Sequence, residues 1–193
     1  MSTRYTKAGW LFTVTFVILT FGCSTLPSDN GGSETVSRTT KERPAKYTYA
    51  IELMKRKEYD KAYDVFISLE KKYPNVDLYT NIAIIYLNKK NYDKAKLYVE
   101  KSIALGLDSH ILQNIYGVVL RNIGSFDAAL KAYSASITKN ANYADAYLNL
   151  AILYDIYIDS PSKALPYYEK YKELSSNDEK IDKWIIEIKR RIK

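Results

Sequence analysis

The chain has 193 residues, of which 47% are hydrophobic and 26% charged, and this composition fits one folded domain with an ordinary core. Only 7 glycines and 5 prolines are present, which favours a helical body, and the single cysteine excludes an internal disulfide bond. The net charge is +7, but acidic and basic residues are interleaved, which argues against the basic stripe of a nucleic-acid-binding protein.

The first predicted element is an export signal at residues 1–22. Arg4 and Lys7 precede an apolar run over residues 8–21. This run is shorter than the roughly 20 residues that a transmembrane helix needs. A positive segment followed by a short apolar run is typical of a secretory signal peptide, which takes no part in the mature fold.

The end of this run, Leu19-Thr20-Phe21-Gly22-Cys23, resembles the signal of bacterial lipoproteins, although Thr20 replaces the leucine that is usual there. The resemblance implies that Cys23 becomes the first mature residue and carries the acyl chains of a membrane anchor. Ser24 follows in place of the aspartate of inner-membrane lipoproteins, which implies the outer membrane, with the body facing the periplasm. Two alternatives stay open, namely an ordinary cleavage site at Gly22-Cys23-Ser24 and an uncleaved signal anchor.

Residues 23–42 are expected to form the lipidated N-terminus and a disordered linker. Proline, glycine, serine and threonine fill this stretch, and large apolar residues are almost absent. Such a segment cannot bury enough surface to offset the entropy lost on ordering. The linker would hold the folded body away from the membrane.

From residue 43 onward, one pattern recurs about every 34 residues, a period typical of stacked helical hairpins. Four hairpins are predicted, at residues 43–75, 76–109, 110–143 and 144–178. Each has a small residue in its first helix, a large residue three positions later and a small residue in its second helix. The first small residues are Ala50, Ala83, Gly117 and Ala151, the large residues are Leu53, Tyr86, Leu120 and Tyr154, and the second small residues are Ala62, Ala95, Ala129 and Ala164.

This pattern resembles the tetratricopeptide repeat family over residues 43–178. The resemblance implies an all-α fold, a right-handed superhelical solenoid of about four hairpins whose first helices line the concave side. The fourth hairpin departs from it with about one extra residue near Ile158-Asp159-Ser160-Pro161. Pro166 falls inside its second helix, where a kink or a late helix start is expected.

The remaining residues, 179–193, are predicted to form a capping helix, which solenoids need to cover their last apolar face. Its start follows a capping-box pattern, Ser176-x-x-Glu179. An apolar stripe with helical spacing, with Trp184 as a core residue, consists of Ile181, Trp184, Ile185, Ile188 and Ile192. Helix ends elsewhere are predicted from N-caps at Asn91 and Ser125 and from a left-handed C-cap at Gly106.

No catalytic pattern is found, so the protein is not expected to be an enzyme. His110, the only histidine, falls at a predicted helix start, and Cys23 has no histidine partner for thiol chemistry. No spacing typical of a metal site and no glycine-rich phosphate loop occurs. No cofactor, metal, nucleic acid or small-molecule substrate is therefore expected.

The expected binding site is the concave side of the first helices. By resemblance, the residues that face it are Tyr47, Ile51, Asn81, Ile84, Asn114, Val118, Arg121, Leu148, Asn149 and Ile152. Such a mixed aliphatic and amide surface suits an extended or helical peptide, although ordinary packing between helices is the alternative for each position. Arg121 stands almost alone as a cation, which argues against a clamp for a C-terminal carboxylate.

Together these features predict an envelope-anchored scaffold that helps to assemble a periplasmic or outer-membrane machine such as a pilus, a secretin or a cell-wall complex. The short array is similar to the lipoprotein partners of type IV pilus secretins, by analogy of fold alone. The alternative is an adaptor that presents a periplasmic protease or a peptidoglycan hydrolase to its substrate.

Overall fold

The computed structural model describes residues 45–175 and 179–193, which belong to one compact unit. The signal at residues 1–22, the lipidation site Cys23 and the linker at residues 23–42 lie outside the described residues and stay predictions. The capping-box residue Ser176 lies outside them as well.

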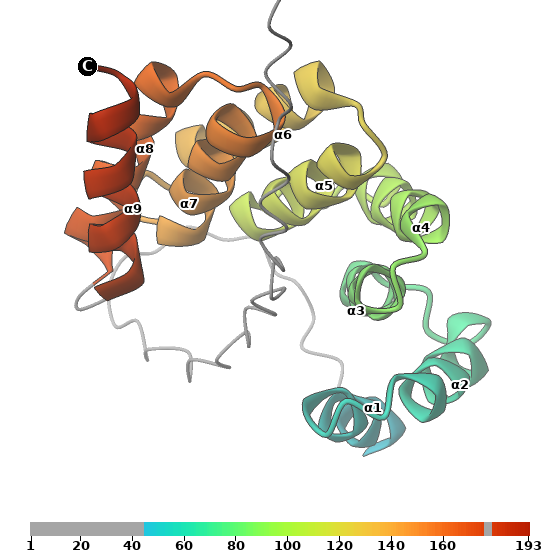
Figure 1. The fold of residues 1–193 in the computed structure, drawn as a ribbon. Helices are drawn as coiled ribbons and strands as arrows, with labels where there is room; N and C mark the ends of the chain where they lie inside the picture. The colour runs from blue at the N-terminus through green and yellow to red at the C-terminus, as the bar shows by residue number, and fades with distance from the viewer. Residues whose placement is uncertain (1–44, 176–178) are drawn as a thin grey trace, which may run out of the picture. The chain divides into compact units, whose positions relative to one another are not determined.

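Within the described part of the chain the fold is all-helical, as Figure 1 shows. Four antiparallel hairpins and a last helix follow one another in chain order. The helices are α1 (Ala45–Lys55), α2 (Tyr59–Glu70), α3 (Val76–Asn88), α4 (Tyr92–Ala104), α5 (His110–Asn122), α6 (Phe126–Lys139), α7 (Ala144–Ile152) with the π-helical turn η1 (Leu153–Tyr157), α8 (Pro161–Leu174) and α9 (Glu179–Arg191).

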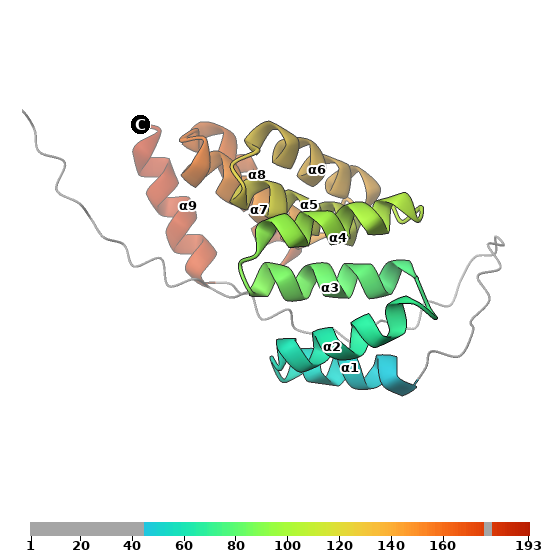
Figure 2. The same cartoon turned by 90° about the vertical axis from the view of Figure 1, so that its right-hand side faces the viewer.

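Each helix packs against the next helix in the chain, and α3, α5 and α7 also contact one another in turn. Figure 2 shows the second hairpin beside the first, with α3 next to α2. One hairpin cannot bury its apolar face alone, so the stack forms the core. The predicted fold class, a solenoid of four helical hairpins with a capping helix, is confirmed.

The small residues of the repeat lie where the two helices of a hairpin touch. All seven alanines at these positions have no exposed surface. Gly117 takes the eighth position, and a β-carbon placed on it would lie 2.4 Å from Cε1 of Tyr133. The third hairpin therefore replaces alanine with glycine because a tyrosine ring from α6 occupies that space.

The turn inside each hairpin has the same geometry in all four repeats. Two positions before the second helix, it contains a residue with positive φ, namely Lys57, Lys90, Gly124 or Asp159. The next backbone N–H donates at 2.7–2.9 Å to a carbonyl near the end of the first helix, from Glu58 to Leu53, Asn91 to Tyr86, Ser125 to Leu120 and Ser160 to Tyr154. These hydrogen bonds cap carbonyls that the helix itself leaves unpaired.

The fourth hairpin contains one extra residue between the N–H donor and the carbonyl acceptor of this turn hydrogen bond. Tyr154 and Ser160 are six positions apart, whereas the corresponding residues of the other hairpins are five apart. The helix accommodates the insertion by widening to π geometry over Leu153–Tyr157. The insertion therefore lies slightly earlier than the sequence suggests, inside the helix and not in the loop near Ile158.

Pro166 does not delay the second helix of this hairpin, so a late start is wrong. Helix α8 begins at Pro161 and continues through Pro166 to Leu174. Pro161 at the first position has a φ suited to a helix, and Pro166 costs one hydrogen bond, to the carbonyl of Ser162. Both Pro166 and Ser162 are exposed, so water can solvate that carbonyl.

The predicted helix ends are mostly correct. The Asn91 side chain accepts a hydrogen bond from the N–H of Lys94 at 3.2 Å, and Gly106 has a φ of 86°. Ser125 stands at the predicted N-cap, but only its backbone carbonyl accepts a helical bond there. Asn75 and Ser109, which the sequence analysis missed, cap α3 and α5 through their side chains.

Helix α9 buries Ile181, Ile185 and Ile188 against the fourth hairpin. Trp184 meets the ring of Tyr168 edge to face but remains 39% exposed, so it lies at the rim of the core. Ile192 follows the end of the helix and is exposed, which corrects its predicted place in the buried stripe.

Candidate functional site

The first helices of the hairpins, α1, α3, α5 and α7, carry all ten residues of the predicted binding surface, which we call the A-helix face. Four of these residues occupy the same repeat position, one residue after the small residue of their helix. They form an aliphatic row, with one half-buried side chain from each hairpin, namely Ile51, Ile84, Val118 and Ile152. Each packs partly on the core and leaves part of its surface in solvent.

A hydrogen bond joins the first two hairpins beneath this row. The Nδ2 group of Asn81 donates to the Tyr47 hydroxyl at 2.7 Å and to the carbonyl of Asp77 at 2.8 Å. Tyr47 is only 4% exposed, and its ring meets Phe66 edge to face. Asn81 therefore braces α3 against α1, which is the packing role that the sequence analysis left open.

A second polar group joins the third and fourth hairpins. The buried side chain of Asn149 donates at 3.0 Å to the buried amide oxygen of Asn114. Asn114 lies 3.4 Å from the Tyr143 hydroxyl, and Arg121 lies 3.4 Å from the amide oxygen of Asn149. Burial raises the pKa of Tyr143 well above its usual value, which keeps the hydroxyl neutral.

The structure therefore divides the predicted surface into two layers. Tyr47, Leu148 and the two asparagines of the second polar group are buried, so a partner could reach them only by opening packed contacts. The aliphatic row, Asn81 and Arg121 keep part of their surface exposed. Binding by any of the ten stays a prediction, and the outer layer is the part that a partner meets first.

Arg121 is the cation of this surface. Its guanidinium lies 5.3 Å from the centroid of the Tyr157 ring, a cation–π contact. Among the described residues, neither its Nε nor the buried hydroxyl of Tyr133 has a hydrogen-bond partner. Burial raises the pKa of Tyr133, and the nearby Arg121 charge opposes that rise.

Tyr157 was not among the residues predicted for this surface. It stands at the end of η1, so the extra residue of the fourth hairpin sets its position. The repeat spacing carries little signal of this, because the successive turn residues Lys57, Lys90, Gly124 and Asp159 are 33, 34 and 35 positions apart.

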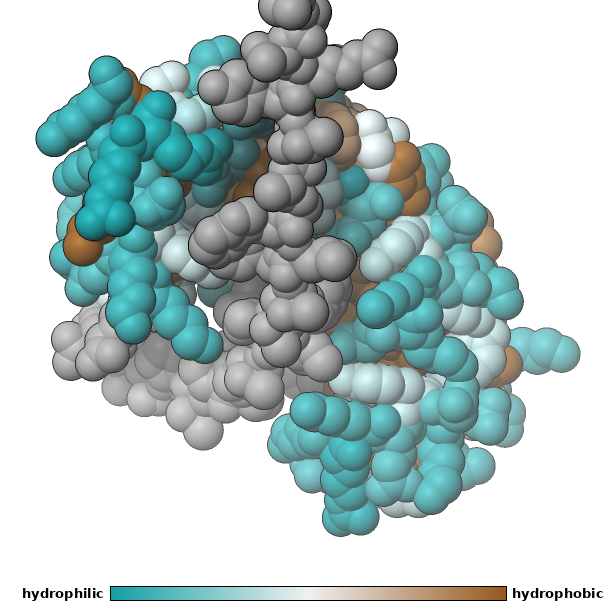
Figure 3. Space-filling view, in the orientation of Figure 1, coloured by the Kyte–Doolittle hydropathy of each residue, from teal (hydrophilic) through white to brown (hydrophobic). Residues whose placement is uncertain are grey.

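On the view in Figure 3, the surface of the described residues is mainly hydrophilic, with hydrophobic residues in small separate groups. Residues 45–175 and 179–193 contain no group of three or more histidine, cysteine, aspartate or glutamate side chains placed to hold a metal. Over the same residues, none of the helices has the length and apolarity of a membrane span.

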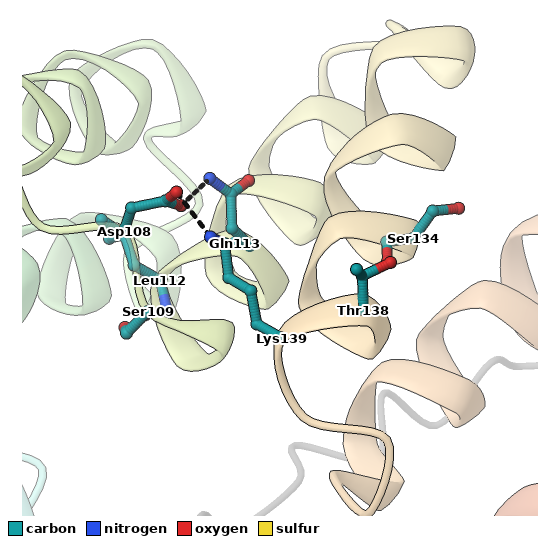
Figure 4. Close-up of polar contacts among 7 residues, drawn as sticks. All are labelled: Asp108, Ser109, Leu112, Gln113, Ser134, Thr138 and Lys139. Atoms are coloured by element: carbon teal, nitrogen blue, oxygen red, sulfur yellow. Dashed lines mark hydrogen bonds and ion pairs between the residues drawn. The ribbon is translucent and has the colours of Figure 1, made fainter.

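A further polar cluster fixes the connection between the second and third hairpins (Figure 4). Asp108 accepts hydrogen bonds from Nε2 of Gln113 at 2.8 Å and from Nζ of Lys139 at 2.5 Å. The hydrogen bonds from Lys139 and Gln113 lower the pKa of the Asp108 carboxyl. These contacts join the loop before α5 to both helices of the third hairpin.

Comparison with known proteins agrees with this geometry. Residues 76–105, which contain α3 and α4, match the model of the tetratricopeptide repeat family. No curated protein matches the chain significantly.

Several solved structures are similar to the chain. A crystal structure of MamA is 25% identical, covers 65% of this chain and 74% of its own, and has a TM-score of 0.59. The C-terminal part of a repeat protein from Cytophaga hutchinsonii is 25% identical, covers 74% of this chain and 56% of its own, and has a TM-score of 0.65. YrrB, described as a repeat protein with an unusual peptide-binding site, is 21% identical, covers 67% of each chain and has a TM-score of 0.57.

The fold and the surface together define an all-helical repeat protein. The chain has the fold of tetratricopeptide-repeat solenoids, with one matched repeat at its centre and a capping helix at its end.

Proposed function

We propose that the protein is a binding scaffold and that a peptide segment of a partner protein lies along the A-helix face. The observation that carries this proposal is the aliphatic row, in which four successive hairpins each present one half-exposed aliphatic side chain. Asn81 and Arg121 border the row and can hydrogen-bond to a peptide backbone or side chain. YrrB, whose fold is similar, is described as having a peptide-binding site, which supports the use of this architecture for peptides.

The expected binding is moderate in strength. Each apolar side chain of a partner that is buried on the row contributes about 1.5–3 kcal/mol. Ordering an extended peptide offsets much of this gain. A dissociation constant of roughly micromolar order follows from a few such contacts.

The proposed role is binding and not catalysis. His110, the single histidine of the chain, packs edge to face on Tyr143 with ring centroids 4.9 Å apart. Burial lowers its pKa, so the ring is neutral at physiological pH. Its place at the start of α5, between Tyr143 and Asn140, fits a packing role.

We further propose that the scaffold is a lipoprotein attached through Cys23 to the outer membrane and facing the periplasm. The support is the sequence of residues 1–24, with its short apolar run before the only cysteine. There the scaffold would help to assemble an envelope machine such as a pilus, a secretin or a cell-wall complex. Fatty-acid labelling in a bacterial host tests the anchor, since label that persists in Cys23→Ala, or is absent from the wild type, contradicts it.

Site-specific crosslinking tests the binding role. The full chain, expressed in its envelope, carries a photoreactive residue at Ile84 in the row or, as a matched control, at Leu97, which is 51% exposed on α4. A structural envelope protein captured at Ile84 and absent at Leu97 supports the scaffold. A protease or peptidoglycan hydrolase captured there supports the adaptor alternative, and equal capture at both positions contradicts binding along the row.

A further inference from the structure

Two clefts open at the same place in the repeat, each between the second helix of one hairpin and the next hairpin along the chain. The first cleft, of about 430 Å³, lies between hairpins one and two, and the second, of about 500 Å³, between hairpins three and four. Four of their lining positions correspond: Asp60 to Asp127, Tyr86 to Tyr154, Lys94 to Lys163 and Lys89 to Ile158.

The correspondence follows from the small residues of the repeat. Each aspartate stands two positions before the alanine of its second helix, and each lysine of the third pair stands one position before it. Each tyrosine of the second pair stands three positions after the alanine of its first helix. Lys89 and Ile158 each stand one position before the turn residue with positive φ, Lys90 or Asp159. The two clefts are therefore versions of one site.

In the first cleft, a lysine from the chain itself occupies this site. Lys89 forms an ion pair with Asp60 across the cleft. Lys94 lies beside it with its Nζ 5.3 Å from the centroid of the Tyr86 ring. Lys89 therefore pairs with Asp60 although a second cation, Lys94, lies nearby.

In the second cleft, the closing lysine is replaced by Ile158. Asp127 is exposed and forms no ion pair within residues 45–175 and 179–193. Lys163 keeps the place of Lys94, with its Nζ 5.9 Å from the Tyr154 ring. The other acidic groups near η1, Asp155 and Asp159, pair with Arg191 and so are already neutralised.

The second cleft has fewer charged lining residues than the first. Phe126 packs against Tyr157 at a ring distance of 5.6 Å, and Leu130 replaces the tyrosine of the first cleft, Tyr63. Two of the lining residues, Tyr157 and Ile158, belong to a run of three exposed large hydrophobic residues at the insertion, with 63% of Ile156, 40% of Tyr157 and 36% of Ile158 in solvent. Consecutive exposed apolar residues of this kind mark a surface that contacts a partner.

We propose that the second cleft binds a lysine or arginine side chain of a partner peptide that also carries an aliphatic neighbour. The cation pairs with Asp127, and the stem of the side chain lies on Tyr157 and Leu130. The aliphatic neighbour packs on the exposed run at residues 156–158. The first cleft shows the same chemistry within the chain, where Lys89 pairs with Asp60.

This site differs from the A-helix face. Its lining residues come from the turns inside the hairpins, the ends of the first helices and the starts of the second helices, and none of them is among the ten residues predicted for that face. The inference therefore goes beyond the proposed function. The two surfaces adjoin where the Tyr157 ring contacts Arg121, so the variants that test this site leave both of these residues unchanged.

Backbone NMR of the full chain with defined peptides tests the proposal. The probe is the peptide acetyl-Leu-Arg-Ile-amide, and the control replaces arginine with citrulline, which has nearly the same shape and no charge. The arginine peptide is expected to shift the amide signals of residues 124–130 and 154–163 and to bind about threefold more tightly than the citrulline peptide, as exposed ion pairs allow. Shifts confined to the A-helix face would bear on the proposed function alone and would overturn the second site.

Three variants sharpen the test. Asp127→Asn should remove the preference for arginine, whereas Asp60→Asn, in the occupied first cleft, should leave it unchanged. Ile158→Lys restores the lysine of the repeat and should block the peptide from within the chain. The proposal is overturned if Asp127→Asn retains the preference for arginine, and since Asp127 is an exposed residue, that variant is expected to fold.

Discussion

Asn149 donates a hydrogen bond to the amide oxygen of Asn114 at 3.0 Å, and both side chains are buried between α5 and α7. The corresponding contact between the second and third hairpins involves Ile115, which is also buried and stands two positions before Gly117, as Asn149 stands two positions before Ala151. The same repeat position therefore carries either an apolar residue or a hydrogen-bonded amide. Buried amides are stabilising only when their partners are present.

The replacement Asn149→Ile should destabilise the fold by about 1–3 kcal/mol, because it leaves the buried amide oxygen of Asn114 without its donor. The double variant Asn114→Leu with Asn149→Ile should recover most of this loss, since neither side of the interface then buries an unpaired amide. Urea unfolding of Asn149→Ile, Asn114→Leu, the double variant and the wild type measures the difference. A double variant that is as unstable as the sum of both single changes would contradict this account.

Gly117 is needed because of the Tyr133 ring. Gly117→Ala should destabilise the fold by about 1–3 kcal/mol, since the new methyl group would lie 2.4 Å from the ring carbon and the site is fully packed. In an open helix position, replacing glycine with alanine would stabilise the helix by about 1 kcal/mol. A loss of stability in Gly117→Ala therefore indicates the clash with the Tyr133 ring. Thermal unfolding measures this loss. In a Tyr133→Leu background Gly117→Ala should no longer destabilise the fold, whereas in a Tyr133→Phe background it should cost as much as in the wild type because the ring remains.

Arg191 holds the end of α9 on the fourth hairpin. It pairs with Asp155 at 2.5 Å and with Asp159 at 3.3 Å, and the Asp155 side chain is only 13% exposed. Arg191→Gln should therefore increase local opening of α9 and accelerate amide hydrogen exchange there about fivefold. Arg190→Gln is the matched control, because the Arg190 ion pair with Glu187 lies within α9, and exchange that is equally fast in both variants would contradict a docking role.

The Asp108 cluster predicts a dependence of stability on pH. Hydrogen bonds from Lys139 and Gln113 lower the pKa of Asp108 from its usual value of 3.8. A lowered folded-state pKa stabilises the protein above the unfolded pKa, and this contribution disappears as the pH falls through the folded-state value. Asp108→Asn should therefore be less stable than the wild type at pH 7, with a difference that shrinks below about pH 3.8; a constant difference in urea unfolding across this range would argue against the cluster.

The sequence predicts the repeat well because small and large residues recur at fixed positions. Ala83 and Ala95 pack between α3 and α4, and Gly106 ends α4, as their positions in the pattern suggest. The π-helical turn could not be located from the pattern, since an extra residue can be accommodated in a loop or in a helix. Pro166 misleads because its effect depends on whether solvent reaches the carbonyl one turn earlier.

The repeat pattern was also insufficient to predict the details of the binding surface. Position in the repeat places all ten residues on the correct helices, but it does not tell which side chains meet across neighbouring hairpins. Tyr47 is buried because Phe66 and Asn81 cover it, and this depends on contacts 19 and 34 positions away. Tyr157 was missed because the insertion, and not the repeat, brings it beside Arg121.

The most direct test of the binding role is the affinity of a peptide that is selected on the full chain from a random library and is shown by crosslinking at Ile84 to bind the A-helix face. Calorimetry would compare the wild type with Val118→Asp, in the aliphatic row, and with Leu97→Asp, on the exposed surface of α4. The account predicts that Val118→Asp weakens binding about tenfold or more, since a charge would be buried against an apolar peptide, and that Leu97→Asp leaves it unchanged. A folded Val118→Asp variant that binds the peptide as tightly as the wild type would contradict it.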